Sequence, residues 1–248
     1  MLRLPNPRDP QTLPPAFWRW FDGSVVTMPR SKMPRVVFHG TRSPVEFDQF
    51  IAGTIRDDDG EVIVSDARDP STYLGPHFTE SDAVASKFAM GHAASWDRSR
   101  YVHDAGGAGG RVIPVYLAIR KPKVFKSDQS MWDWIAKHGD SYQVDTVIED
   151  SGEDDHGPAA RMEAIEWLRR NGDDSSMDDG GSTPYESALE ELGTSARGLL
   201  VSMGFDGVKY RNDVEGGGWS WAPLGSGQIK SAVANSGRYD SSSDSIID

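Results

Sequence analysis

The sequence predicts a mixed α+β protein, and three observations support this class. Runs of β-branched and aromatic residues at 35–38 and 111–119 are typical of strands. Helix-like stretches follow at 131–137, 159–170 and 185–203, and further strand-like runs close the sequence. This order differs from the regular alternation of strand and helix that builds a parallel sheet.

The first part of the chain is expected to be an extended arm. Five prolines interrupt residues 1–15, so we expect neither a helix nor the continuous apolar core of a signal peptide there. At 16–21, aromatic side chains lie on both sides of one helical turn, which predicts a short helix held to the body by its rings. We expect a single domain over residues 16–240 and a polar tail at 241–248.

The strand at 35–38 stops on three residues of a different kind, His39, Gly40 and Thr41. Polar residues at the tip of an apolar strand form a place to hold a ligand, and a glycine lets the ligand approach the backbone closely. A histidine and a glycine at a strand end are also common in ordinary turns. The triplet therefore predicts a site only together with the motifs that follow.

The segment Tyr73-Leu-Gly-Pro-His-Phe-Thr79 leads into a helix that we expect at 82–90. Ser81 precedes this helix and can accept hydrogen bonds from its first backbone amides. Val84 and Phe88 are four residues apart and lie on one side of the helix. Phe88 therefore either packs into the core or presents its ring to a ligand.

The strand at 111–119 contains Pro114, which argues for an edge strand or a bulge because proline lacks the backbone donor of a regular ladder. Residues 126–203 are expected to form a helical and acidic insertion that decorates the fold. Its runs rich in Asp, Ser and Gly, at 149–156 and 173–181, are typical of solvated loops.

One helix and several strands are expected to complete the chain. The helix-like stretch 185–203 is expected to be interrupted near Gly193 and to end at Gly204. The strand-like runs that follow lie at 207–211, 219–224 and 228–233.

Composition and charge exclude several classes of function. The 248 residues include no cysteine, which excludes disulfides, thiolate zinc sites, iron–sulfur clusters and a cysteine nucleophile. A net charge of −12 repels a phosphate backbone, so nucleic acid is disfavoured as a partner. No apolar stretch approaches the roughly 20 residues of a membrane span, and no glycine-rich phosphate loop occurs. We expect a cytoplasmic protein. We also expect no metal site, because the six histidines are scattered along the sequence.

Six motifs along the chain resemble those of a known family. They lie at 17–21, 36–41 (Val-Val-Phe-His-Gly-Thr), 74–88 (beginning Leu-Gly-Pro-His-Phe-Thr), 115–119, 204–215 and 228–237. In this order they resemble the ADP-ribosyltransferases of phages and mobile elements that are of the polyvalent-protein type. More distantly, they are similar to the diphtheria toxin and poly(ADP-ribose) polymerase class, whose triad is His-Tyr-Glu. The resemblance implies two small packed antiparallel sheets that form an NAD cleft, with helices around them.

The resemblance assigns roles to several residues. His39 matches the triad histidine, which bonds the adenosine ribose, and the backbone of Gly40 would receive the nicotinamide carboxamide. His77 stands where the wider class has the triad tyrosine, which is a departure from the pattern. A neutral histidine can still stack on a pyridinium ring, whereas a protonated one would repel it. Tyr73 is an alternative source of the missing ring, and Phe88 matches the second stacking aromatic.

Three neighbours of these residues complete the expected NAD site. Thr41 and Phe78 flank the two histidines in sequence, and Arg42 is either a contact for the pyrophosphate or an ordinary surface arginine.

Glu215 is the expected catalytic carboxylate. It fits the phage-type pattern Tyr-Arg-Asn, two residues, Glu. In the polymerases, however, the glutamate directly precedes a strand that ends near a glutamine, and counting back from Gln228 leads to Ser220. Both registers remain open at this point, and Glu215 could also be an ordinary acidic residue of a surface turn.

The chemistry needs few groups. Cleavage between nicotinamide and ribose passes through an oxocarbenium-like state, and nicotinamide leaves without needing a proton. One ionised glutamate can accept a hydrogen bond from the ribose 2′-hydroxyl and offset the growing positive charge. The remaining residues hold NAD in position.

The leading hypothesis is a mono-ADP-ribosyltransferase that uses NAD to modify a macromolecule, most simply a host protein in the host cytoplasm if the gene is a phage's. An NAD glycohydrolase, with water as the acceptor, is the alternative within the same chemistry. A non-catalytic binding or structural module of a phage on the same fold is the alternative from another class, and the change at His77 favours it. A plain α+β domain with accidental motif matches would be the last possibility.

Overall fold

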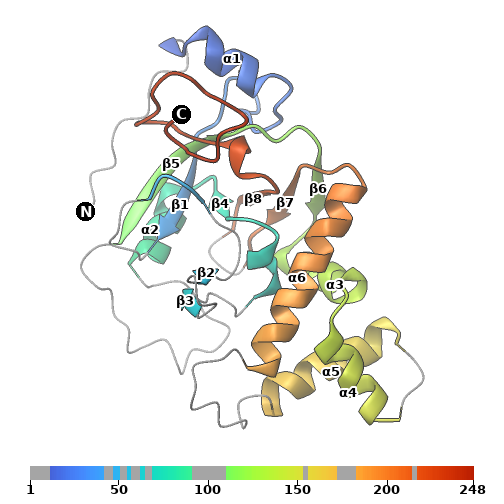
Figure 1. Cartoon of the computed structure of the whole chain (residues 1–248). Helices are drawn as coiled ribbons and strands as arrows, with labels where there is room; N and C mark the ends of the chain where they lie inside the picture. The colour runs from blue at the N-terminus through green and yellow to red at the C-terminus, as the bar shows by residue number, and fades with distance from the viewer. Residues whose placement is uncertain are drawn as a thin grey trace. The chain divides into compact units, whose positions relative to one another are not determined.

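A computed structural model describes residues 12–41, 47–50, 55–56, 62–64, 69–90, 110–152, 156–171, 183–213 and 217–248 (Figure 1). The chain divides into two compact units. The sheet unit comprises Met1–Phe50, Pro76–Asp128 and Phe205–Asp248, and the helical unit comprises Ile51–Gly75 and Gln129–Gly204. Among the described residues, no helix is both long and apolar enough to cross a membrane.

The sheet unit contains a seven-stranded sheet in the order β6-β7-β8-β4-β1-β5-β9. The strands β6 and β7 are parallel, and the other neighbours are antiparallel. Their bounds are β1 Val37–Thr41, β4 Phe78–Thr79, β5 Arg111–Leu117, β6 Pro122–Phe125, β7 Gly207–Arg211, β8 Trp219–Pro223 and β9 Ile229–Ser231. The α+β class is confirmed. The expected pair of small packed sheets is not confirmed, because the other described strands, β2 (Ile55–Arg56) and β3 (Val62–Val64), form only a two-stranded hairpin in the helical unit.

The two faces of the large sheet are covered differently, as the alternation of side chains along each strand requires. One face carries the main apolar core, whose buried members are Val26, Val37, Phe50, Phe78, Val115, Leu117, Ile119, Trp221, Ile229 and Ile246. The other face is covered by α1 (Pro15–Phe21) and α2 (Asp82–Ala89). Phe17 of α1 packs on Tyr116 with ring centroids 4.9 Å apart, as expected for a helix held by its rings.

The strand β1 extends further than predicted. It runs through His39, Gly40 and Thr41, which pair with β5 up to Arg111. Polar residues thus do not end this strand, because β5 continues to offer backbone partners to it. The predicted site residues therefore alternate between the two faces of a sheet and do not form a turn.

The prediction that Pro114 marks an edge or a bulge is wrong. β5 lies inside the sheet, between β1 and β9. The carbonyl of Pro114 accepts a hydrogen bond from the amide of Ala232 at 3.0 Å, just beyond the last ladder pair, Val115 and Ser231. The nitrogen and carbonyl of an antiparallel residue face the same neighbour. The backbone N–H that Pro114 lacks would therefore point toward the chain beyond β9, where the strand pairing has already ended.

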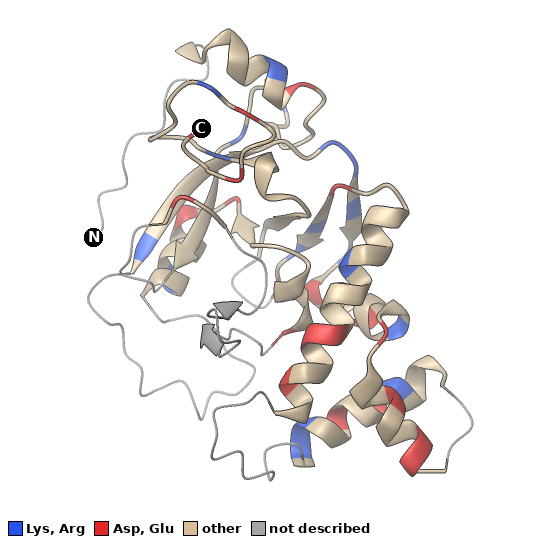
Figure 2. Cartoon of the chain, in the orientation of Figure 1, with Lys and Arg blue, Asp and Glu red and all other residues tan. Residues whose placement is uncertain are grey.

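The helical unit contains four α-helices among its described residues. Their bounds are α3 Asp128–His138, α4 Tyr142–Asp150, α5 Pro158–Asn171 and α6 Pro184–Ser202, and a short 3₁₀ helix, η2, spans Pro70–Tyr73. The helix α4 was not expected from the sequence, since its acidic end was assigned to a loop. Figure 2 shows acidic residues along the helices of this unit.

The prediction of an interruption near Gly193 is also wrong, because α6 is continuous. A Cβ at Gly193 would overlap the carbonyl oxygen of Pro70 and lie 2.6 Å from the Cβ of Tyr73. The glycine therefore allows η2 to pack closely on α6.

The polar C-terminal residues are bonded to the sheet unit. Ile246 is 5% exposed, its carbonyl accepts from the amide of Ser231 at 2.7 Å, and its amide donates to the carbonyl of Asp48 at 2.6 Å. The ammonium of Lys230, which is fully buried, donates to the carbonyls of Ser243 and Ser245 at 2.9 and 2.8 Å. Because a buried ammonium must be satisfied, Lys230 ties this segment to the sheet.

Candidate functional site

The two histidines predicted for the site are in direct contact. β1 and β4 are neighbours in the sheet, and Nδ1 of His39 lies 2.9 Å from the carbonyl oxygen of His77. A carbonyl only accepts hydrogen bonds, so Nδ1 of His39 carries the hydrogen and donates it. In the neutral ring, Nε2 of His39 is then an acceptor.

The ring of His39 is held by aromatic neighbours on the core face of the sheet. Its centroid lies 4.9 Å from that of Phe50 and 5.5 Å from that of Phe78. Phe78 is 1% exposed and belongs to the main core. It therefore supports His39 from inside the protein.

Gly40 and Phe88 are brought together on the opposite face. A Cβ at Gly40 would overlap the carbonyl oxygen of Ala85 and lie 2.8 Å from the Cβ of Phe88. Gly40 is thus required for the close packing of α2 on β1. Phe88 is half-buried beside it, while Ala85 and Ala89 form the buried face of the helix. The helix begins as predicted, with the hydroxyl of Ser81 accepting from its third residue.

His77 has a partner that the sequence did not reveal. Its Nδ1 lies 2.7 Å from the hydroxyl oxygen of Tyr210 on β7, and the two rings are nearly perpendicular with centroids 5.5 Å apart. His77 is half-buried and Tyr210 is 5% exposed. The only sequence signal for this contact was the position of Tyr210 in a predicted strand, which does not indicate the strand's neighbours.

Next to this pair lies a row of buried polar side chains. Ser220 on β8 pairs with Thr79 on one side and Tyr210 on the other, and its hydroxyl lies 3.4 Å from Nδ2 of Asn212. All four side chains belong to residues less than 9% exposed. Ser220 is the position to which the polymerase register leads. A serine, and no carboxylate, therefore stands at that place in the strand.

Two predicted residues lie outside the described part of the chain. Arg42 follows the end of β1, and Glu215 lies in the loop between β7 and β8. The base of this loop is closed by a hydrogen bond of 3.0 Å from the amide of Asn212 to the carbonyl of Gly218. Gly218 has φ +105°, a conformation that favours glycine.

Thr41 and Tyr73 differ in what surrounds them. Thr41 is the half-buried last residue of β1, opposite Arg111. Tyr73 belongs to the helical unit, where it is 5% exposed and packs with Leu189. Its ring is a core element of that unit.

A charged cluster on the core face of the sheet was not expected. Glu80 forms an ion pair with Arg35 and accepts a hydrogen bond of 3.2 Å from Nε1 of Trp221. The ammonium of Lys209 lies 4.4 Å from the ring centre of Trp219 and 4.5 Å from that of Trp221. Burial lowers the pKa of Lys209, and the carboxylate of Glu80 opposes this effect. The rings of the two tryptophans thus form cation–π contacts with the ammonium of Lys209.

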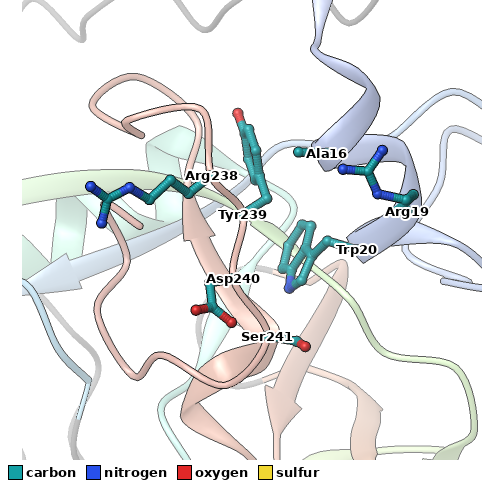
Figure 3. A pocket seen from close by; sticks show the side chains of 7 residues that line it. All are labelled: Ala16, Arg19, Trp20, Arg238, Tyr239, Asp240 and Ser241. Carbon is teal, nitrogen blue, oxygen red and sulfur yellow. The ribbon is translucent and has the colours of Figure 1, made fainter.

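A hollow of about 510 Å³ lies elsewhere in the sheet unit (Figure 3). It is formed by α1 and the segment after β9, with Trp20 and Tyr239 on its wall and the charged groups of Arg19 and Asp240 near it. None of the predicted NAD-site residues lines it. Among the described residues, no three His, Asp or Glu side chains gather as a metal ion would need.

A family model described as ADP-ribosyltransferase in polyvalent proteins matches residues 32–239. The chain belongs to this family. The match spans β1, β4, α2 and the strands β5 to β9, so it includes the elements around the two histidines and their partners. No curated protein and no solved structure matches the chain significantly. The resemblance inferred from the six motifs is confirmed, and the family supports ADP-ribosyl transfer in general terms.

Proposed function

We propose that this ADP-ribosyltransferase transfers a single ADP-ribose from NAD to a macromolecular acceptor, most simply a protein in the cytoplasm, and releases nicotinamide. The observation that carries the proposal is the junction of β1, β4 and α2. There His39 contacts His77, and Gly40 lies against Phe88. The four residues come from two motifs of a chain that belongs to the family.

His39 would hold the adenosine ribose. Its Nδ1 donates to the carbonyl of His77, so Nε2 is the acceptor of the neutral ring and can receive a hydrogen bond from a ribose hydroxyl. Phe50 and Phe78 fix the ring plane. Holding the ribose in one place lowers the entropy cost of reaching the transition state.

His77 and Phe88 would hold the nicotinamide. Both are half-buried, one just before β4 and the other on α2. Flat rings on two sides of a pyridinium restrict its rotation, and a neutral imidazole does so without charge repulsion. The backbone of Gly40, next to Phe88, would receive the carboxamide, while Thr41 and Arg42 would lie toward the phosphates.

Glu215 would stabilise the oxocarbenium-like transition state. It follows Asn212, whose amide and side chain hold the base of the loop and contact Ser220. A serine, Ser220, occupies the alternative strand position, so we place the carboxylate for the reaction in this loop. An acceptor with basic character would suit the acidic chain, whose net charge is −12.

One observation favours a second candidate, a non-catalytic module on the same fold. The polar row around Ser220 contains no carboxylate among its described members. If Glu215 does not act, the chain would bind a partner without cleaving NAD. An NAD glycohydrolase, which transfers ADP-ribose to water, shares the site of the leading proposal and differs only in the acceptor.

The test uses adenine-labelled NAD, a host lysate and three proteins: wild type, Glu215→Gln and Asp213→Asn. Asp213 is the matched control, because it is an exposed acidic residue of the same loop, paired with Arg211. We expect nicotinamide release and labelled protein from wild type and Asp213→Asn, and a loss of about 100- to 1,000-fold in Glu215→Gln.

Release of nicotinamide without labelled protein would identify a glycohydrolase. Equal activity of wild type and Glu215→Gln would contradict the assignment of the carboxylate. No release by any of the three proteins would favour the non-catalytic module.

A further inference from the structure

The hydroxyl of Tyr210 is in hydrogen-bond contact with the ring of His77. Tyr210 lies on β7, which is separated from β4 by β8, and its hydroxyl oxygen is 2.7 Å from Nδ1 of His77. Tyr210 pairs with Ser220, and Ser220 pairs with Thr79, so the three residues form one row across the sheet. His77 is two residues before Thr79 and therefore lies on the same side of the chain. The reach across the sheet is therefore set by backbone pairing.

The direction of this hydrogen bond follows from the two groups. An imidazole nitrogen without a hydrogen is a strong acceptor, and a phenol is a good donor whose oxygen lone pairs are partly drawn into the ring. We therefore assign the hydroxyl of Tyr210 as the donor and Nδ1 of His77 as the acceptor. In that arrangement the hydrogen of the neutral His77 ring is on Nε2.

The backbone of His77 is held as well. Its carbonyl accepts the hydrogen bond of His39 at 2.9 Å. One contact thus fixes the main chain, and the other fixes the rotation of the ring about its side-chain bonds. A ring held at both points is pre-organised to form one wall of a stacking site.

We propose that Tyr210 is the positioning residue of this enzyme: it orients the His77 ring and keeps Nδ1 as an acceptor, so that a neutral imidazole stacks on the nicotinamide of NAD. The inference rests on the proposed function, since it assumes that His77 contacts NAD. It adds a residue on a strand far from His77 in the sequence, and it explains how a histidine serves at a position where a tyrosine was expected.

The first test is spectroscopic and needs no activity. Nitrogen-15 NMR of the imidazole side chains in the full-length protein distinguishes a nitrogen that carries hydrogen from one that does not, and His77→Gln identifies the His77 signals. We expect Nδ1 without hydrogen and Nε2 with hydrogen in wild type. Tyr210→Phe, which removes only the hydroxyl, should shift the Nδ1 signal.

The second test measures NAD turnover. Tyr210→Phe should raise KM for NAD by roughly three- to tenfold, the effect of one lost hydrogen bond, with a smaller change in kcat. Tyr116→Phe is the matched control, because Tyr116 is a fully buried tyrosine of the same sheet that packs under α1. It should change neither the His77 signals nor KM.

The outcomes separate the two claims. Normal NAD turnover by wild type together with unchanged His77 signals in Tyr210→Phe would overturn the role of Tyr210 alone. A KM effect of equal size in Tyr116→Phe would also overturn it, since the loss would then be one of general stability. No NAD binding by wild type would overturn the proposed function, and with it this role.

Discussion

His39 donates a hydrogen bond from Nδ1 to the carbonyl oxygen of His77 at 2.9 Å, although 38 residues separate the two in the sequence. The bond joins β1 to the residue that precedes β4. It places the two histidines of the site in a fixed relation before any ligand arrives. Their geometry is therefore part of the fold and should respond to changes in the fold's supporting residues.

Replacing His39 by alanine should reduce both stability and NAD use. The change removes the bond to His77 and the ring that packs on Phe50 and Phe78. We expect a loss of about 1–3 kcal/mol in the free energy of unfolding, measured by urea denaturation, and a large drop in nicotinamide release.

The control for this change is His138→Ala. The Nδ1 of His138 also bonds a carbonyl, that of Trp134 at 3.1 Å, but within one helix of the helical unit. Its replacement should leave NAD use unchanged. Equal loss of NAD use in the two variants would contradict a special role for His39.

Gly40→Ala should displace α2. The added Cβ would overlap the carbonyl oxygen of Ala85 and crowd the Cβ of Phe88, so the helix must move. Overpacking of this kind costs about 1–3 kcal/mol, and NAD affinity should fall because Phe88 shifts with the helix. Gly198→Ala on α6, where no atom lies within 4 Å of the new Cβ, should be neutral or stabilising by up to about 1 kcal/mol. A fully stable Gly40→Ala with unchanged NAD affinity would contradict the packing described for α2.

Arg161→Met should destabilise the helical unit. Arg161 is 8% exposed and donates to the carbonyls of Ala136 and Gly139 and to the carboxylate of Asp145. Loss of the guanidinium leaves buried acceptors without their donor, which should cost about 2–4 kcal/mol in thermal or urea unfolding. Arg170→Met, at a side chain that is 69% exposed, should change stability by less than about 0.5 kcal/mol. Similar effects of the two changes would contradict this account.

Acid should remove a small stabilisation of α5. Hydrogen bonds from Arg169, against the opposing effect of burial and with smaller contributions from Arg170, lower the pKa of Glu166 from 4.5 to about 2. A carboxylate whose pKa is lower in the folded state stabilises the fold above its ordinary pKa, and this contribution is lost as pH falls through about 2. The side chain is 38% exposed, so solvent screening limits the effect to about a few tenths of a kcal/mol, as is usual for an ion pair on a protein surface.

The measurement compares wild type with Glu166→Gln across that window. Wild type should be slightly more stable than Glu166→Gln at pH 6, and the difference should vanish near pH 2. A carboxyl signal of Glu166 that titrates near pH 4.5 in NMR would contradict the lowered pKa.

Local features of the structure were predictable from the sequence. Ser81 caps α2 as its position before a helical pattern indicated, and β7 spans Gly207–Arg211 as predicted. The family also followed from the order of short motifs. In each case the signal lies within a few neighbouring residues, where capping chemistry and side-chain periodicity act.

Features that depend on distant partners were not predictable. Gly193 suggested a helix break, but its reason is the close approach of Pro70. Ile246 was assigned to a polar tail, yet it pairs with Ser231 and enters the core. The contact between Tyr210 and His77 was not predictable, because only the order of strands brings the two together. Sequence periodicity indicates that a strand exists and says little about which strand lies beside it.

We propose that NAD binds at the junction of β1, β4 and α2. Hydrogen–deuterium exchange of the full-length protein, with and without a non-cleavable carbocyclic analogue of NAD, tests it most directly. We predict slower exchange at 37–41, 77–79 and 82–89, with no change around Trp20 and Tyr239. Protection confined to the hollow beside α1, or no protection at all, would contradict the account.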